Sequence, residues 1–203
     1  ALNGGAFLGM FFLTAIFLQQ VRGASALVTG LQLLPMGVAA VIAAVAASNL
    51  VTRFGVRPIQ IAGALLSVAG LLLLAQVDAG TSYVGGLLPA LVVFGAGIVS
   101  IGVPAQIAAV ADFTTADAGA ASGVVTAGYQ VGGALGLALI TTLSDSRVTD
   151  ALAGGSSQAQ ALVEGFHRGL LVAAAFAAVN VVLALLTPQI SPTPEQLAEA
   201  VAV

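Results

Sequence analysis

The sequence predicts an all-α polytopic membrane protein with six transmembrane helices. First, 59% of the residues are hydrophobic, only 6% are charged, and the mean hydropathy is +1.11, whereas ordinary soluble domains are about 25% charged. Second, the chain has six charge-free runs of at least 20 residues, the length that one helix needs to cross a bilayer. Third, most connections between these runs are short, which is typical of antiparallel neighbouring helices.

The composition excludes several classes of function. With 5 Lys+Arg against 8 Asp+Glu, the chain has no basic patch for nucleic acid. It has no cysteine and a single histidine, His167, so disulfides, thiolate sites and a metal site are not expected. Neither a nucleophile–base pair nor a carboxylate pair falls within a span, which argues against an enzyme. No cofactor is expected.

We place the spans in order along the chain, with a polar tail after them. The segment from Ser144 to Glu164 contains Gly154 and Gly155 and predicts a flexible exposed loop. By this assignment every carboxylate lies in a connection or in the tail. The six predicted spans and the tail cover residues 1–21, 26–49, 58–77, 84–110, 118–143, 169–187 and 188–203.

The first span is rich in phenylalanine and ends in two glutamines. Phe11 and Phe12 either form bulk that faces lipid or form the aromatic wall of a binding cavity, and spacing does not separate these readings. On the first reading, Gln19 near the end of this span is a residue of the membrane interface. The second span contains one further glutamine, Gln32.

Two arginines surround a glycine and a proline after the second span. Arg53, Gly55 and Arg57 predict a tight turn that is anchored to headgroups, although a plain positively charged loop has the same composition. The third and fourth spans follow this turn. The third is mostly leucine and alanine and offers no chemistry, and the fourth is rich in glycine.

The fifth span has the most ordered pattern. Gly128, Gly132 and Gly136 recur every fourth residue and predict a smooth ridge where another helix approaches closely. The same rotation places four polar residues on one arc of the helix, which should face protein or water; hydrogen bonds to a neighbouring helix would also explain them. This arc consists of Ser122, Thr126, Tyr129 and Gln130.

Three segments resemble the major facilitator superfamily of transporters. The turn from Arg53 to Pro58 resembles the loop signature of that family. Residues 18–35, with Gln19-Gln20-Val21-Arg22-Gly23 and Leu33-Leu34-Pro35, resemble the fourteen-span drug:proton antiporters of the EmrB/QacA type. Residues 117–136, with Gln130-Val131-Gly132-Gly133-Ala134-Leu135-Gly136, resemble the penultimate span of that branch. Thr126 and Tyr129 depart from it, since many relatives carry Asn and Arg there.

The resemblance implies that this chain is the C-terminal half of a transporter, built from two inverted three-helix repeats. It implies that Arg53, Arg57 and the tail are cytoplasmic and that the missing partner is an N-terminal transmembrane half. The first, second, fourth and fifth spans would surround a central cavity, with the third and sixth outside. The location would be the cell membrane, specifically the inner membrane of a bacterium.

For function, we expect proton-coupled efflux of small lipophilic compounds by alternating access. The expected cavity contacts are Gln19, Gln32, Thr126, Tyr129 and Gln130, with Phe11 and Phe12 as apolar surface. Because no carboxylate is placed within a span, the protonatable coupling group is expected in the missing half, and this half also offers no anion for a cationic substrate. The alternatives are a six-span scaffold that does not transport and, within transport, a metabolite or sugar carrier.

Overall fold

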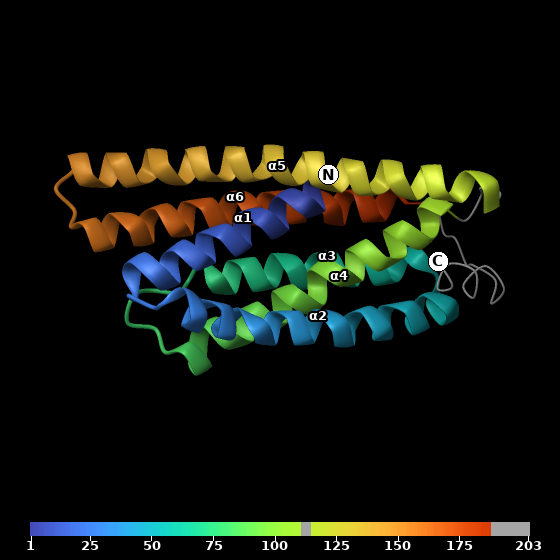
Figure 1. Cartoon of the computed structure of the whole chain (residues 1–203), viewed down its shortest axis with the longest axis horizontal. Helices are drawn as coiled ribbons and strands as arrows, with labels where there is room; N and C mark the ends of the chain where they lie inside the picture. The colour runs from blue at the N-terminus through green and yellow to red at the C-terminus, as the bar shows by residue number, and fades with distance from the viewer. Residues whose placement is uncertain (111–114, 188–203) are drawn as a thin grey trace.

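The computed structural model describes residues 1–110 and 115–187, and all regular structure in this part of the chain is helical. Six helices run along the long axis of the molecule (Figure 1), two of them extended by a π-helical turn. The predicted tail 188–203 lies outside the described residues. The elements are α1 (Leu2–Ile16), η1 (Phe17–Val21), α2 (Ala26–Phe54), α3 (Val56–Leu74), η2 (Tyr83–Leu87), α4 (Leu88–Val110), α5 (Thr115–Ala153) and α6 (Gln158–Leu186).

Each of the six helices is long and apolar enough to cross a membrane, which confirms the predicted fold class. The mean hydropathy of their most apolar stretches ranges from 1.5 to 2.5, and each stretch carries at most two charged residues. Alternating helix directions bring three connections to one end of the bundle, on the left in Figure 1. We call it the three-connection end; its connections are residues 22–25, 75–82 and 154–157.

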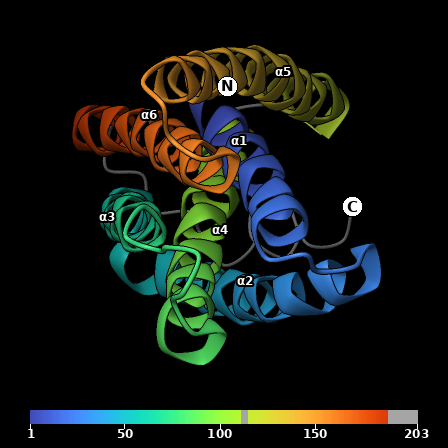
Figure 2. The same ribbon diagram turned by 90° about the vertical axis from the view of Figure 1, so that its left-hand side faces the viewer.

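The helices pack as two interlocked groups of three. Helix α1 packs against α5 and α6, whereas α4 packs against α2 and α3, and α3 also packs against α6. Figure 2 shows the two groups, with α5, α6 and α1 above α3, α4 and α2. Exchanging the first three helices with the last three reproduces these five contacts, whereas the close packing of α5 on α6 has only a weak counterpart between α2 and α3. This internal symmetry is the arrangement expected of two three-helix repeats.

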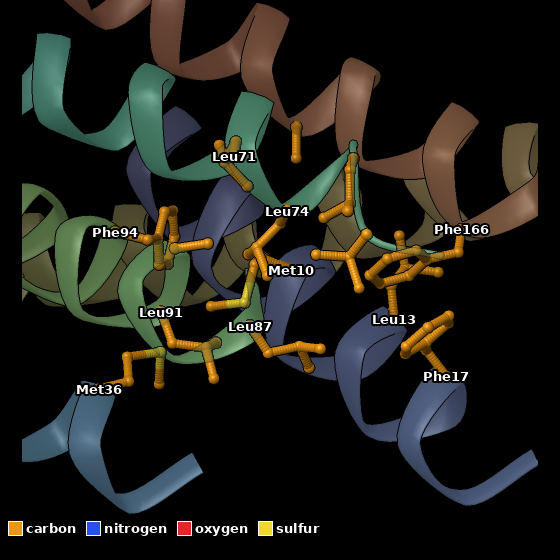
Figure 3. Packing of buried hydrophobic residues seen from close by; sticks show 14 of the residues in the cluster. Met10, Leu13, Phe17, Met36, Leu71, Leu74, Leu87, Leu91, Phe94 and Phe166 are labelled. Atoms are coloured by element: carbon orange, nitrogen blue, oxygen red, sulfur yellow. The ribbon is translucent and has the colours of Figure 1, made fainter. Parts of the chain in front are cut away.

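A buried apolar cluster joins the two groups. Met10, Leu13 and Phe17 from α1 and η1 meet the side chains of α3, α4 and α6 (Figure 3), and Met10 and Phe17 are almost fully covered. Met36 extends the cluster to α2. Because the cluster draws on all six helices, with Ile140 contributed by α5, it fixes the two groups relative to each other.

Glycine allows α1 and α5 to approach backbone to backbone. A methyl group at Gly136 would collide with the backbone of Gly5, and one at Gly4 would collide with the carbonyl of Tyr129. Gly132 lies in the same contact, opposite Ala1. In contrast, a methyl group at Gly128 would meet nothing within 4 Å. Of the predicted ridge, Gly132 and Gly136 therefore lie against α1 in this structure, and Gly128 lies outside the contact.

The segment from Ser144 to Glu164 is helical apart from a short turn, so the predicted flexible loop is wrong. Helix α5 continues to Ala153, and Gly155 reverses the chain with φ +88°. Helix α6 then starts from a capping box in which Ser157 and Gln160 bond each other's backbone N–H groups. The placement of all carboxylates in connections is also corrected, because Asp145 and Asp150 lie in α5 and Glu164 lies in α6.

Gly55 forms the whole junction between α2 and α3. Its φ of +82° lies in the region that residues with a Cβ rarely adopt, and its N–H donates to the carbonyl of Val51. Arg53 lies exposed in the last turn of α2, and Arg57 is half-buried in the first turn of α3. Of the three residues of the predicted turn motif, Gly55 therefore makes the turn, through its backbone conformation.

We expect Gly55→Ala to lower the free energy of unfolding by about 1–3 kcal/mol, because alanine would have to adopt φ +82° with ψ 174°, a conformation that is essentially restricted to glycine. Gly30→Ala is the matched control. It lies inside α2 in open space, where removing glycine should add about 0.5–1 kcal/mol. Thermal unfolding of the protein in detergent measures both variants, and equal melting temperatures for the two would contradict this account of the turn.

Candidate functional site

A cleft of about 340 Å³ lies between α1, α5 and α6 toward the three-connection end. One stripe of α5 faces it, made of residues 141, 144, 145 and 148, which recur at helical spacing. Its volume is at the lower end of the range of roughly 300–1,000 Å³ that small-molecule sites occupy. The lining residues are Phe12, Leu13, Ile16, Phe17, Val21, Thr141, Ser144, Asp145, Val148, Leu162 and Phe166.

The predicted contacts of the first span lie on the exposed side of α1. Phe12 is 43% exposed and lines the cleft, whereas Phe11 is 40% exposed and stacks on Phe7 with ring centroids 6.1 Å apart. Gln19 lies in the π-helical turn and is exposed. Of these three residues, the structure brings only Phe12 into the cleft.

Gln32 lies apart from the cleft, near the start of α4. Its backbone carbonyl accepts a hydrogen bond of 2.8 Å from the hydroxyl of Tyr83 in η2. Its side-chain Oε1 is buried and has no hydrogen-bond partner among the described residues. An acceptor left without a donor is costly in an apolar environment, so this atom is a place where a donor from a ligand or water would be stabilised.

The polar arc of α5 lies near the beginning of α1. Thr126 and Gln130 are exposed and Tyr129 is half-buried, and the Thr126 hydroxyl donates to the carbonyl of Ser122. Tyr129 packs opposite Gly4. Gln19 follows Gly4 by fifteen residues, so at 1.5 Å per residue the two positions lie about 22 Å apart along α1 and the π-helical turn that extends it. The seven predicted contacts therefore do not form one cluster in this structure.

Two polar contacts between helices were missed from the sequence. Asn3 donates to the carbonyl of Ile98 at 3.2 Å, and Gln106 donates to the hydroxyl of Ser122 at 2.8 Å. The first joins α1 to α4, and the second joins α4 to α5. The sequence does indicate such contacts, because Asn3 and Gln106 are single amides in apolar spans, and an amide there generally needs a partner on a neighbouring helix.

A clamp of polar and aromatic groups holds the connection between α3 and η2. Arg22 donates to the carbonyls of Asp78, at 3.1 Å, and Thr81, and it lies over the ring of Phe17, 5.2 Å from its centroid. Phe17 stacks on Phe166 of α6, with centroids 4.5 Å apart, as Figure 3 shows from the side. Burial lowers the pKa of the Arg22 guanidinium, which nevertheless stays charged in water.

His167 joins the same connection from α6. Its Nε2 lies 2.9 Å from the carbonyl oxygen of Val77 and 3.8 Å from a carboxylate oxygen of Asp78. In the tautomer that carries the proton on Nε2, it donates to Val77. Together with Arg22, it ties α1, α6 and the connection between α3 and α4 into one unit.

A second groove, of about 580 Å³, lies between α5 and α6 at the same end of the bundle. Arg147 and Glu164 form an ion pair across it at 2.7 Å, and Asp150 and Arg168 also line it. Both partners of the pair are substantially exposed to solvent, so it contributes little stability. Within the described residues, no three His, Asp or Glu side chains gather as a metal site would require.

Comparison with known proteins identifies relatives over most of the chain. The sequence profile of the Major Facilitator Superfamily matches residues 1–202. The chain is 35% identical over 188 residues to the puromycin resistance protein pur8 of Streptomyces alboniger, which covers 86% of this chain and 37% of that protein.

Two further relatives carry similar descriptions. The lincomycin resistance protein of Streptomyces lincolnensis is 32% identical over 139 residues, 67% of this chain and 28% of that protein. The tetracenomycin C resistance and export protein of Streptomyces glaucescens is 31% identical over 145 residues, 71% of this chain and 27% of that protein. The match thus spans less than two fifths of the length of each of the three relatives.

Proposed function

The chain belongs to the major facilitator superfamily, and from this premise we propose that it is the C-terminal half of a secondary active transporter that exports drugs or toxic lipophilic compounds. The observation that carries the proposal is the similarity to three proteins described by their resistance to antibiotics, one of them also described as an export protein. This similarity favours the export of drugs over the transport of a metabolite or sugar.

The proposal of a half transporter is supported by the share of each relative that the chain matches and by its unpartnered surface. Helices α2 and α5 are the least covered, with 17% of their apolar stretches buried. In Figure 2, α5, α1 and α2 lie along one side of the bundle. An N-terminal half seated on that side would enclose a cavity, with Phe11, Phe12, Gln19, Gln32, Thr126, Tyr129 and Gln130 as its proposed polar and apolar contacts.

We further propose that protons drive the cycle and that the coupling group lies in the other half. Coupling by alternating access needs a protonatable side chain whose pKa responds to burial. The buried polar side chains of the described residues are Thr14, Thr29, Gln60, Ser67 and Ser144, and none of them titrates near neutral pH. The proposed location is the cell membrane, the inner one where a bacterium has two. The resemblance of residues 53–58 to the loop signature of the family supports placing Arg53 and Arg57 in the cytoplasm.

The test expresses the full-length protein in a drug-sensitive bacterium and measures the accumulation of puromycin, lincomycin and tetracenomycin C. We expect the cells to accumulate less of at least one compound than cells that lack the protein. A protonophore should raise the accumulation back to the level of those control cells. Gln130→Ala should change the relative protection against the three compounds while membrane insertion stays unchanged. Normal insertion with unchanged accumulation of every compound would contradict export and favour the scaffold alternative.

A further inference from the structure

The groove between α5 and α6 at the three-connection end carries two opposite charges that lack a partner in the described part of the chain. Arg147 and Glu164 neutralise each other across it, in an ion pair of 2.7 Å. Arg168 and Asp150 also line the groove and are exposed, and neither makes an ion pair or a side-chain hydrogen bond with a described residue. Among the described residues, the groove therefore offers one cation and one carboxylate that are free for a ligand.

The α6 wall of this groove changes from polar to apolar with depth in the membrane. Helix α6 begins at the three-connection end, so Glu164 comes first, Arg168 follows and Leu171 lies deepest. At 1.5 Å per residue, Leu171 lies about 4.5 Å deeper than Arg168, and Glu164 lies about 6 Å nearer the surface. The charge-free run of α6 starts at Gly169. Arg168 therefore marks the edge of the hydrocarbon on this wall.

The α5 wall has the same order. Leu143, Arg147 and Asp150 recur at helical spacing toward the three-connection end. The ion pair of Arg147 with Glu164 sets the register of the two walls, so Asp150 lies on the surface side of this pair and Arg168 on its deep side. Their positions are roughly 10 Å apart along the helix axis. The long arginine side chain, which extends toward water at such a boundary, spans part of this gap, and a ligand with two charges spans the rest.

We propose that this groove binds a phospholipid whose headgroup ends in a primary ammonium, as that of phosphatidylethanolamine does. In such a lipid the acyl chain, the phosphate and the ammonium follow one another toward water, in the same order as Leu171, Arg168 and Asp150. The guanidinium donates charge-assisted hydrogen bonds to the phosphate, and the carboxylate accepts them from the ammonium. A headgroup with a phosphate alone would leave Asp150 unpaired, and a quaternary ammonium has no N–H to donate. The inference does not depend on the proposed export.

The experiment measures binding of phosphatidylethanolamine to the purified full-length protein by native mass spectrometry from detergent. Phosphatidylglycerol, which has the phosphate but no ammonium, is the second probe. We expect Arg168→Gln to weaken binding of both lipids, and Asp150→Asn to weaken binding of phosphatidylethanolamine alone. Each loss should be about fivefold, near the upper value for one exposed charge pair. The wild type should also bind phosphatidylcholine more weakly than phosphatidylethanolamine, because the choline nitrogen carries no proton.

Asp145→Asn is the matched control, because it removes the same charge from the same helix but lines the cleft between α1, α5 and α6. It should bind both lipids as the wild type does. The proposal is overturned if Asp150→Asn keeps the wild-type affinity for phosphatidylethanolamine, or if Asp145→Asn loses as much. Glycerophosphoethanolamine, the same headgroup without acyl chains, should not displace the lipid at equal concentration. Displacement would assign the groove to a soluble zwitterion and would equally overturn the proposal of a lipid.

Discussion

Replacing Gly136 with alanine is expected to lower the free energy of unfolding by about 1–3 kcal/mol, the usual cost of an overpacked site. The added methyl group would collide with the backbone of Gly5 and lie 3.1 Å from the ring of Phe176. Backbone atoms cannot turn aside as the end of a side chain can, so α1 and α5 would have to separate. Thermal unfolding of the full-length protein in detergent measures the loss.

Gly128→Ala is the control for this prediction. Spacing puts Gly128 on the same side of α5, but a methyl group there meets nothing within 4 Å. Alanine also favours the helix over glycine by about 1 kcal/mol. The two substitutions should therefore shift the melting temperature in opposite directions. A loss of stability of the same size in both would mean that α5 packs through the whole ridge, as the spacing alone predicts.

Replacing Arg22 with alanine is expected to have the second largest effect, a loss of about 1–3 kcal/mol. The substitution removes two hydrogen bonds from a charged donor and a cation–π contact with Phe17. The carbonyl of Thr81 would then lose its donor, that of Asp78 would keep the N–H of Thr81, and the link from the connection at residues 75–82 to the rest of the bundle would be left to His167 of α6. Melting temperature and proteolytic cleavage of that connection are the two measurements.

Arg168→Ala controls for the loss of a positive charge at the same end of the bundle. Arg168 is exposed, and within the described residues it forms no ion pair, so its removal should change stability by less than about 0.5 kcal/mol. Arg22→Lys should recover part of the stability, since it keeps the charge but has no planar fork. Equal effects of Arg22→Ala and Arg168→Ala would argue against the clamp.

Some features were within reach of the sequence. The six spans follow from charge-free length, which each segment carries by itself. The start of α6 was also readable, because Ser157 followed by Gln160 is a capping-box pattern. The expectation of a loop from Ser144 to Glu164 follows from its charges, which end the charge-free run, and from Gly154 and Gly155. This expectation places three carboxylates outside the helices, among them Asp145, which lines the cleft between α1, α5 and α6.

The sequence by itself determined that this chain crosses a membrane, in six helices, with glycines that permit close approach. Only the tertiary structure decided that Gly136 meets Gly5, that Arg22 holds a connection 56 residues away, and that Asp145 shares a cleft with Phe12. The physical reason is the range of the interactions. Hydropathy and capping depend on neighbours within a few turns, whereas the pairing of helix faces depends on how all six helices bury their surfaces together.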